Sequence, residues 1–256
     1  MQPHQHMALT AGGRTESGPR PLNQDWLDWD LDLGLFVVAD GMGGHNAGEV
    51  AAHLAVQTVR SFVHETRDGG DITWPFGLDP SRSVAANRLL TAFRLANRRV
   101  YSEAAAHPAF SGMGTTLVAA LAAGNRIALA GVGDSRIYRY RSGEITQVTR
   151  DDTWLAALNG GAPRDAAYAK HPMRHVLTAV IGGRDDLAPQ VVEDDVLPGD
   201  ILVLCTDGVH GVVDDRVLVE VLQIAATPTE AAGRLVDAAL ERQAQDNVTA
   251  LVVRVS

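Results

Sequence analysis

The sequence predicts an α+β fold in which antiparallel sheets are covered by helices. Two observations lead to this class. Apolar runs of strand length lie near both ends of the chain and in its middle, and two pairs of amphipathic helical patterns separate them. The resulting order is strands, two helices, many strands, two helices and one strand, which differs from the regular alternation that builds a parallel sheet. The 256 residues suffice for one large domain.

The first half of the chain carries a strand pair and the first two helices. The apolar run at residues 33–39 predicts a strand, and the alternating residues 26–31 predict a half-exposed partner strand. Residues 68–81, rich in Gly, Pro and Asp, form a loop between the two helices. The helices are indicated by apolar stripes at helical spacing: Ala51, Leu54, Ala55, Thr58 and Phe62 in the first, and Leu89, Phe93, Ala96 and Val100 in the second.

The middle of the chain predicts four strands, at residues 116–122, 126–132, 136–141 and 144–149. Ser142-Gly143 forms the hairpin turn between the last two. In the irregular segment that follows, Asp152 is expected to cap a short helix at residues 153–158.

The last third predicts a strand pair at residues 190–196 and 201–206, with a turn at residues 198–200 between them. Two helices follow, and the second has Thr227 as its N-cap and a proline in its first turn. A final strand is expected at residues 248–255.

The charge and cysteine content exclude several classes of protein. The formal net charge is −9, so no basic excess is present to bind a nucleic-acid backbone or an anionic membrane. A single cysteine, Cys205, excludes an intrachain disulfide and suits a reducing compartment. Neither a secretory signal nor an apolar stretch of roughly 20 residues is visible. We therefore expect a cytoplasmic monomer whose partners are neither nucleic acids nor membranes.

Aspartates mark the ends of the main apolar runs. Asp40, Asp134 and Asp207 each follow such a run, and Asp246 opens the last one. Strands that stop at a carboxylate can bring several like charges to one edge of a sheet, where they are costly unless a cation neutralises them. Oxygen ligands on rigid strand ends suit Mg²⁺ or Mn²⁺. The pattern therefore indicates a divalent metal site.

Taken singly, each of these positions has a simpler interpretation. Residues 40–49 can be a Gly-rich turn between a strand and a helix, and an aspartate at a strand end is commonly a turn former. The glycines at positions 41, 43 and 44 do not match a dinucleotide-binding fingerprint, because position 46 is Asn46. Four carboxylates in matching contexts are nevertheless hard to explain by turn chemistry alone.

Six short segments are more informative together than singly. In chain order they are Arg20–Asp25, Val38–Val50, Gly112–Thr116, Gly131–Arg136, Leu204–Gly208 and Gln245–Thr249. In this order the chain resembles the metal-dependent serine/threonine protein phosphatases of type 2C, in their bacterial form. The resemblance implies a central antiparallel β-sandwich flanked by pairs of helices on both outer faces. It also implies a single catalytic domain over residues 1–256, with a flap at about residues 150–183.

The resemblance implies roles for the acidic residues. Asp40 would bridge two metal ions, with the Gly41 carbonyl on one of them. Asp207 and Asp246 would hold the other ion. Asp134, together with Asp207, would match the weaker third metal site of the family.

The resemblance also assigns residues around the ions. Asp25 would steady metal-bound water, and Arg20 would bind the phosphate through its guanidinium fork. His45 is the candidate general acid for the leaving seryl or threonyl oxygen. Arg20 could instead be an ordinary surface arginine, and His45 an ordinary histidine at a helix N-terminus. Gln24 stands where the family often has Glu, a change that removes a charge near the ions.

The activity that the resemblance implies is hydrolysis of phosphoserine and phosphothreonine on proteins. The nucleophile would be a hydroxide activated by two Mn²⁺ or Mg²⁺ ions, with a third ion as an option. The expected partners are phosphorylated proteins made by a cognate kinase. One alternative is a non-catalytic pseudophosphatase that binds phosphoproteins, which the loss of a metal-binding aspartate would favour; none is lost. Another is an enzyme that acts on a small phosphoester.

Overall fold

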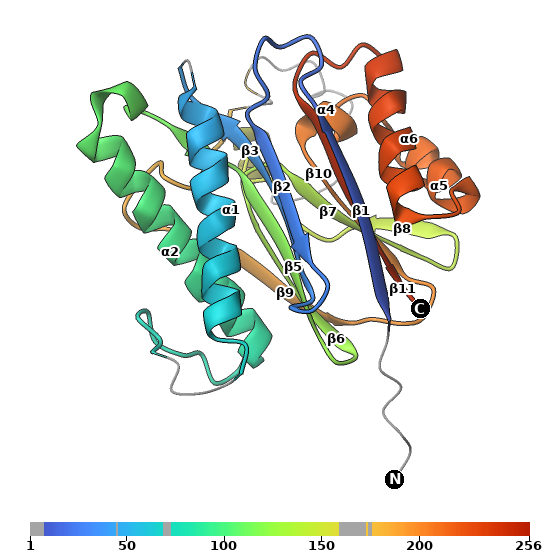
Figure 1. The fold of residues 1–256 in the computed structure, drawn as a ribbon, viewed down its shortest axis with the longest axis horizontal. Coiled ribbons are helices and arrows are strands. Elements are labelled where there is room, and N and C mark those ends of the chain that lie inside the picture. The colour runs from blue at the N-terminus through green and yellow to red at the C-terminus, as the bar shows by residue number, and fades with distance from the viewer. Residues whose placement is uncertain (1–7, 45, 69–72, 159–172, 174–175) are drawn as a thin grey trace.

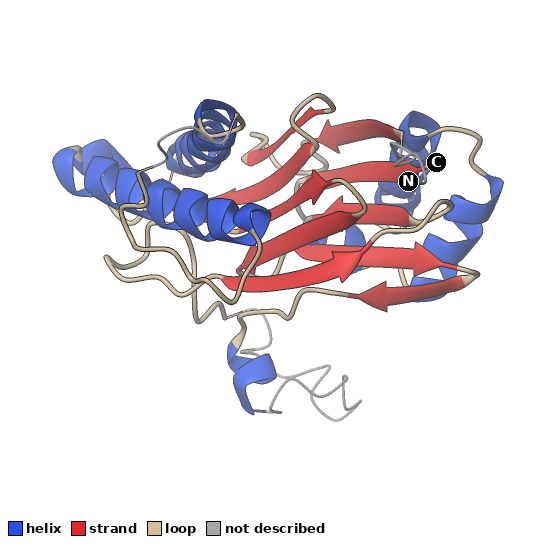
Figure 2. Ribbon diagram, turned by 90° about the horizontal axis from the view of Figure 1, so that it is seen from below, coloured by secondary structure: helices blue, strands red, loops and turns tan. Residues whose placement is uncertain are grey.

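The computed structural model describes residues 8–44, 46–68, 73–158, 173 and 176–256. In this part of the chain, two antiparallel sheets pack face to face and helices cover both outer faces (Figures 1 and 2). The predicted α+β class and its helix-flanked sandwich are therefore confirmed. None of the described helices combines the length and the apolar composition needed to cross a bilayer.

The first sheet has the strand order β1–β11–β10–β7–β8. Its strands are β1 (Leu9–Glu16), β7 (Arg136–Arg141), β8 (Glu144–Gln147), β10 (Ile201–Cys205) and β11 (Val248–Val255). The helices on its outer face are α4 (Asp207–His210), α5 (Asp215–Ile224) and α6 (Pro228–Glu241).

The second sheet has the strand order β2–β3–β5–β6–β9, and β4 pairs with β3 beside it. Its strands are β2 (Asp25–Asp30), β3 (Leu35–Met42), β4 (Gly114–Thr115), β5 (Leu117–Ala123), β6 (Arg126–Val132) and β9 (Gln190–Asp195). Its outer face is covered by α1 (Ala47–Glu65) and α2 (Val84–Ala106). Two short helices, η1 (Pro108–Phe110) and α3 (Trp154–Leu158), lie outside these layers.

The central strands are buried on both faces, which explains their nearly continuous apolar sequences. In β3, Leu35, Val37 and Ala39 belong to the core under α1 and α2. Phe36 and Val38 of the same strand belong to the core between the two sheets. Neighbouring side chains of a strand point to opposite faces, so only a strand covered on both sides needs apolar residues at every position.

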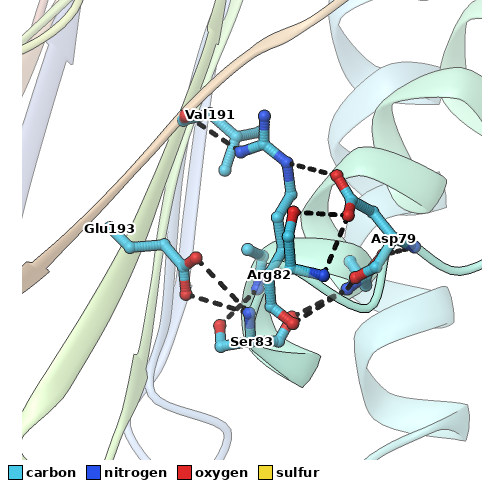
Figure 3. A network of polar contacts seen from close by, with 8 residues as sticks. Asp79, Arg82, Ser83, Val191 and Glu193 are labelled. Carbon is cyan, nitrogen blue, oxygen red and sulfur yellow. Dashed lines mark hydrogen bonds and ion pairs between the residues drawn. The ribbon is translucent and has the colours of Figure 1, made fainter.

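The start of α2 is tied to β9 by polar contacts (Figure 3). Ser83 caps the helix by accepting a hydrogen bond from the Ala86 amide at 3.1 Å. The Ser83 amide itself donates to the carboxylate of Glu193, and Arg82 donates to the Val191 carbonyl at 3.3 Å. The edge strand β9 is thereby fastened to the helix layer.

Most of the predicted elements are confirmed, several with the same bounds. The strands at residues 126–132, 136–141 and 248–255 coincide with β6, β7 and β11. The N-cap of α6 is confirmed, because Thr227 Oγ1 accepts a hydrogen bond from the Glu230 amide at 3.1 Å. The predicted stripe of α2 is wholly buried. In α1 the predicted stripe is confirmed in part: Ala51 and Ala55 are buried, whereas its other members are only half-buried. The buried face continues instead through Ala52, Val56, Val59 and Val63.

Three predictions about the elements are wrong or incomplete. The strand β1 was not predicted, because its sequence includes Gly12-Gly13 and lacks a clear apolar alternation. The strands β9 and β10 are not partners: β9 pairs with β6, whereas β10 pairs with β7 and β11. Asp152 does not cap α3; its side chain accepts the Gly133 amide, and Thr153 takes the capping role. Residues 159–172 and 174–175 of the expected flap lie outside the described residues.

The turn between β9 and β10 is held by Asp200, whose side chain is almost wholly buried. Its carboxylate accepts hydrogen bonds from Arg141 at 2.7 and 2.6 Å and from the Leu197 amide at 2.8 Å. Burial alone would raise the pKa of Asp200, but these hydrogen bonds outweigh it and hold the pKa below its ordinary value. The stabilisation is therefore present above the ordinary carboxyl pKa and is lost as the pH falls through the folded-state pKa.

We expect Asp200→Asn to lower the free energy of unfolding by about 1–3 kcal/mol at neutral pH. This loss should begin to shrink as the pH falls below about 4, the pKa of the carboxyl in the unfolded chain, and should vanish once the pH passes the lower folded-state pKa. Urea unfolding at neutral and acidic pH measures both effects. Asp195→Asn is the matched control, because the Asp195 side chain is exposed and forms an ion pair with Arg126 at 3.5 Å. A loss that is the same at both pH values would contradict the prediction.

Candidate metal centre

Five aspartates meet at one end of the sandwich, the upper end in Figure 1, where β3 ends and α4 begins. Asp25 begins β2 and Asp40 lies near the end of β3 in one sheet. Asp134 follows β6 of that sheet, at the crossing to β7 of the other. Asp207 begins α4 directly after β10, and Asp246 precedes β11. Residues more than 200 positions apart in the sequence are thus brought to one place.

Asp25 and Asp40 lie directly opposite each other in the antiparallel pair of β2 and β3. Like charges at such a position oppose strand pairing. Asp25 is 3% exposed, and its Oδ2 atom accepts hydrogen bonds from Thr206 Oγ1 at 3.0 Å and Thr249 Oγ1 at 2.6 Å. Its Oδ1 atom is buried without a hydrogen-bond partner. A buried carboxylate oxygen left in this way is costly, unless it faces a ligand.

Burial and mutual repulsion raise the pKa values of three of the clustered carboxyls. Burial is the larger cause for Asp25 and raises its pKa to about 7, with Asp207 and Asp246 adding to the effect. Burial likewise raises the pKa of Asp134 to about 7, with Asp207 contributing. The pKa of Asp40 is raised well above its usual range by burial and then by the other four carboxylates. The cluster therefore favours whatever reduces its negative charge, a proton or a cation.

The backbone at the end of β3 is held rigidly. The Asp40 amide donates to Thr116 Oγ1 at 3.0 Å, and the Asp40 carbonyl accepts from Thr115 Oγ1 and the Thr116 amide at 2.8 Å each. A Cβ atom at Gly41 would lie 2.0 Å from the Gly48 carbonyl oxygen, so only glycine fits there. These contacts fix the direction of the Asp40-Gly41 segment.

The loop that carries Asp134 is also fixed. Asp134 is 7% exposed, and its carbonyl accepts a hydrogen bond from His210 Nε2 at 2.9 Å. Because a carbonyl only accepts, this nitrogen carries the proton. Arg136 pairs with Asp151 through two hydrogen bonds of 2.8 and 2.7 Å, which anchor the start of β7.

Asp246 forms an ion pair at the edge of the cluster. Its Oδ2 atom accepts a hydrogen bond from Arg20 at 2.9 Å, and its Oδ1 atom accepts the Asn247 amide at 2.9 Å. Arg20 also donates to the Gln245 carbonyl at 3.0 Å, and its side chain is about half exposed. The predicted phosphate-binding arginine therefore lies at the rim of the carboxylate cluster. His45 lies outside the described residues.

The donor set fits a hard divalent cation in its chemistry. It consists of carboxylate oxygens with no thiolate among them, and the partnerless Oδ1 of Asp25 and the raised pKa values indicate uncompensated negative charge. In the described part of the chain, however, no three His, Cys, Asp or Glu side chains are arranged to hold one metal ion. Both oxygens of Asp246 accept hydrogen bonds from protein donors in this arrangement.

Sequence reasoning missed the neutral residues that build the site. Thr206 and Thr249 bind Asp25, and Thr116 binds the Asp40 amide. Asn247 joins three segments, because its Oδ1 accepts the Gln24 amide while its Nδ2 donates to two carbonyls of residues 17 and 22. Uncharged residues of this kind are common in turns. Only their position next to motif aspartates, as in Thr206-Asp207 and Asp246-Asn247, could have singled them out.

Comparisons with known proteins place the chain in one family. A profile of the family described as protein phosphatase 2C matches residues 18–244. The chain is 36% identical over 223 residues to the serine/threonine protein phosphatase PstP of Mycobacterium tuberculosis, which covers 86% of this chain and 40% of PstP. It is 29% identical over 225 residues to the serine/threonine phosphatase stp of Listeria monocytogenes, covering 86% of this chain and 83% of that protein.

Solved structures show the same similarity. The crystal structure of the catalytic domain of serine threonine protein phosphatase PstP, in complex with two manganese ions, superposes with a TM-score of 0.80 at 33% identity. The superposition covers 97% of this chain and 99% of that one. By contrast, the chain spans only about two fifths of the length of the full PstP sequence.

The crowding of negative charge predicts that removing one carboxylate stabilises the metal-free protein. In the presence of a chelator, Asp40→Asn should raise the free energy of unfolding by roughly 1–3 kcal/mol, because it removes one of several buried like charges. Urea unfolding with excess chelator measures the change. Asp246→Asn is the control and should give no such gain, because Asp246 is paired with Arg20. A metal-free Asp40→Asn protein that is less stable than the wild type would refute this account of the cluster.

Proposed function

Because the chain belongs to the protein phosphatase 2C family, we propose that it hydrolyses phosphoserine and phosphothreonine in proteins with the help of two Mn²⁺ or Mg²⁺ ions. The observation that carries the proposal is the convergence of five aspartates at one end of the sandwich, with a guanidinium at the rim. The two manganese ions of the similar PstP catalytic domain support the choice of cation.

We assign the metal-binding roles as follows. Asp40 would hold two ions, with the Gly41 carbonyl as a further donor to one of them. Asp207 and Asp246 would hold the other ion, and Asp134 with Asp207 would offer a weaker third position. When bound, the ions would supply the positive charge that activates water for attack on phosphorus.

The protein groups around the ions orient the reaction. Asp25 accepts hydrogen bonds from two threonine hydroxyls through Oδ2, which leaves Oδ1 to hold water near the ions. Arg20 presents two donors on its guanidinium, a geometry that suits phosphate oxygens. In the structure these donors contact the Asp246 carboxylate and the Gln245 carbonyl. We propose His45 as the general acid for the leaving oxygen.

The wider setting of the protein is also proposed. We infer that the chain acts as a cytoplasmic monomer on proteins phosphorylated by a cognate kinase. Its one cysteine, Cys205, is a buried free thiol, which agrees with a reducing compartment. The net charge of −9 agrees with protein substrates rather than nucleic acids.

A phosphothreonine peptide assay tests the proposed activity. Turnover should require Mn²⁺ or Mg²⁺ and disappear with excess chelator, and Asp207→Asn should lower kcat by at least about 100-fold, because the variant loses a carboxylate that holds an ion. Asp237→Asn, an exposed aspartate paired with Arg14, is the control and should retain full activity. Activity that survives complete chelation would rule out the mechanism.

The role of Arg20 can be tested separately. Arg20→Ala should raise KM for the phosphopeptide by about 10–100-fold while kcat changes little, because the guanidinium binds phosphate alike in ground and transition states. Arg20→Lys keeps the charge without the fork and should recover only part of the loss. Arg14→Ala removes another exposed ion-paired arginine and serves as the control. An unchanged KM in Arg20→Ala would exclude Arg20 from the phosphate site.

A further inference from the structure

Asn97 is a buried polar residue in the middle of α2 that holds a segment distant in the chain. Its side chain is nearly inaccessible, at 1% exposure. Its Oδ1 atom accepts a hydrogen bond from the Gly182 amide at 2.8 Å. Its Nδ2 atom donates to the carbonyls of Arg184 and Asp185 at 2.9 and 3.1 Å. One side chain therefore fixes three backbone groups in a stretch that is neither helix nor strand.

The segment held by Asn97 continues directly into a pairing with β4. Ile181 and Thr115 exchange two backbone hydrogen bonds, of 3.1 and 2.9 Å. The next residue, Gly182, has a left-handed φ of 86°, and a Cβ atom there would lie 2.4 Å from Val100 Cγ1 of α2. The segment thus lies between α2 and β4 and contacts both of them.

Beyond β4 lies the end of β3 with its proposed metal ligands. In the pairing of β3 with β4, Gly41 lies opposite Thr115. The side chain of the same Thr115 donates to the Asp40 carbonyl at 2.8 Å. Ile181 therefore pairs with β4, and β4 pairs with the end of β3. Asn97 anchors the segment that contains Ile181 to α2.

We propose that Asn97 is a positioning residue for the metal centre, which fixes the backbone of Asp40 and Gly41 through residues 181–182 and Thr115. The inference rests on the metal-binding roles proposed above for Asp40 and Gly41. Metal–ligand distances are held within about 0.2 Å, so loosening this support weakens binding. Groups that orient a ligand directly change affinity roughly 10–100-fold. Asn97 acts through intervening contacts. We therefore expect its removal to weaken metal affinity by about three- to tenfold, less than the removal of such a group.

The chain offers a matched control on the same helix. Asn87 is 3% exposed and lies ten residues before Asn97. Its Nδ2 atom donates to the carbonyls of Asp79, Arg82 and Ser83 at 2.9, 3.3 and 3.0 Å, and its Oδ1 accepts the Asp79 amide at 2.8 Å. It thus anchors a loop with four hydrogen bonds, one more than Asn97 makes, but that loop contacts β9 rather than β4 (Figure 3).

The test compares Asn97→Ala with Asn87→Ala by Mn²⁺ titration, followed through the electron paramagnetic resonance signal of the free ion without substrate. Urea unfolding with chelator measures the stability of each variant. Both should lose stability, but only Asn97→Ala should bind Mn²⁺ about three- to tenfold more weakly than wild type. A cavity of about 200 Å³ adjoins Asn97, lined also by Phe76 and Arg94, so water can reach the freed backbone groups and the variant should fold.

If Asn97→Ala does not fold, Gly182→Ala replaces it. Its Cβ atom would press on Val100 and displace the segment while Asn97 is kept; Gly77→Ala, at a φ of 79° in open space, is its control. The proposal is overturned if the variant that folds binds Mn²⁺ with an affinity within twofold of that of its matching control. Weaker Mn²⁺ binding in a protein that hydrolyses no phosphopeptide would support the positioning role while refuting the proposed phosphatase activity.

Discussion

The structure depends on one electrostatic constraint: several carboxylates are held close together in a poorly solvated place. Asp25 and Asp40 face each other across two strands, and Asp134 and Asp207 lie near enough to raise the pKa values of the group. Such an arrangement opposes folding of the metal-free chain, because like charges repel and burial penalises each of them. A bound divalent cation would turn the repulsion into attraction.

The two-sheet architecture is what brings these charges together. In antiparallel pairs, the end of one strand lies beside the start of its neighbour. Asp40 near the end of β3 therefore meets Asp25 at the start of β2, and Asp207 after β10 lies near Asp246 before β11. The core between the sheets then holds both pairs at the same end of the sandwich. The acidic site is thus set by strand register in two different sheets.

Neutral polar side chains give the site its rigidity. Threonine hydroxyls bind Asp25 and the backbone of Asp40, and Asn247 joins the start of β11 to the loop that carries Arg20. These hydrogen bonds add no charge to a place already crowded with it. The same principle recurs farther out in α2, where two buried asparagines hold backbone groups of the neighbouring loops. A buried amide satisfies several backbone groups without the desolvation cost of an ion.

The sequence by itself determined the central strands and the long helices, because apolar periodicity there reflects burial directly: β6, β7 and β11 have the predicted bounds, and the α2 stripe is buried as expected. It also singled out Asp40, Asp134, Asp207 and Asp246, since each borders an apolar run. Tertiary structure alone decided the rest. The strand β1 is specified by its pairing with β11 rather than by its glycine-containing sequence. The strands β9 and β10 lie in different sheets because they pair with β6 and β7, about 60 residues earlier in the chain. The threonines and asparagines of the site acquire their roles only when folding places them beside a carboxylate or a free amide, which no local pattern encodes.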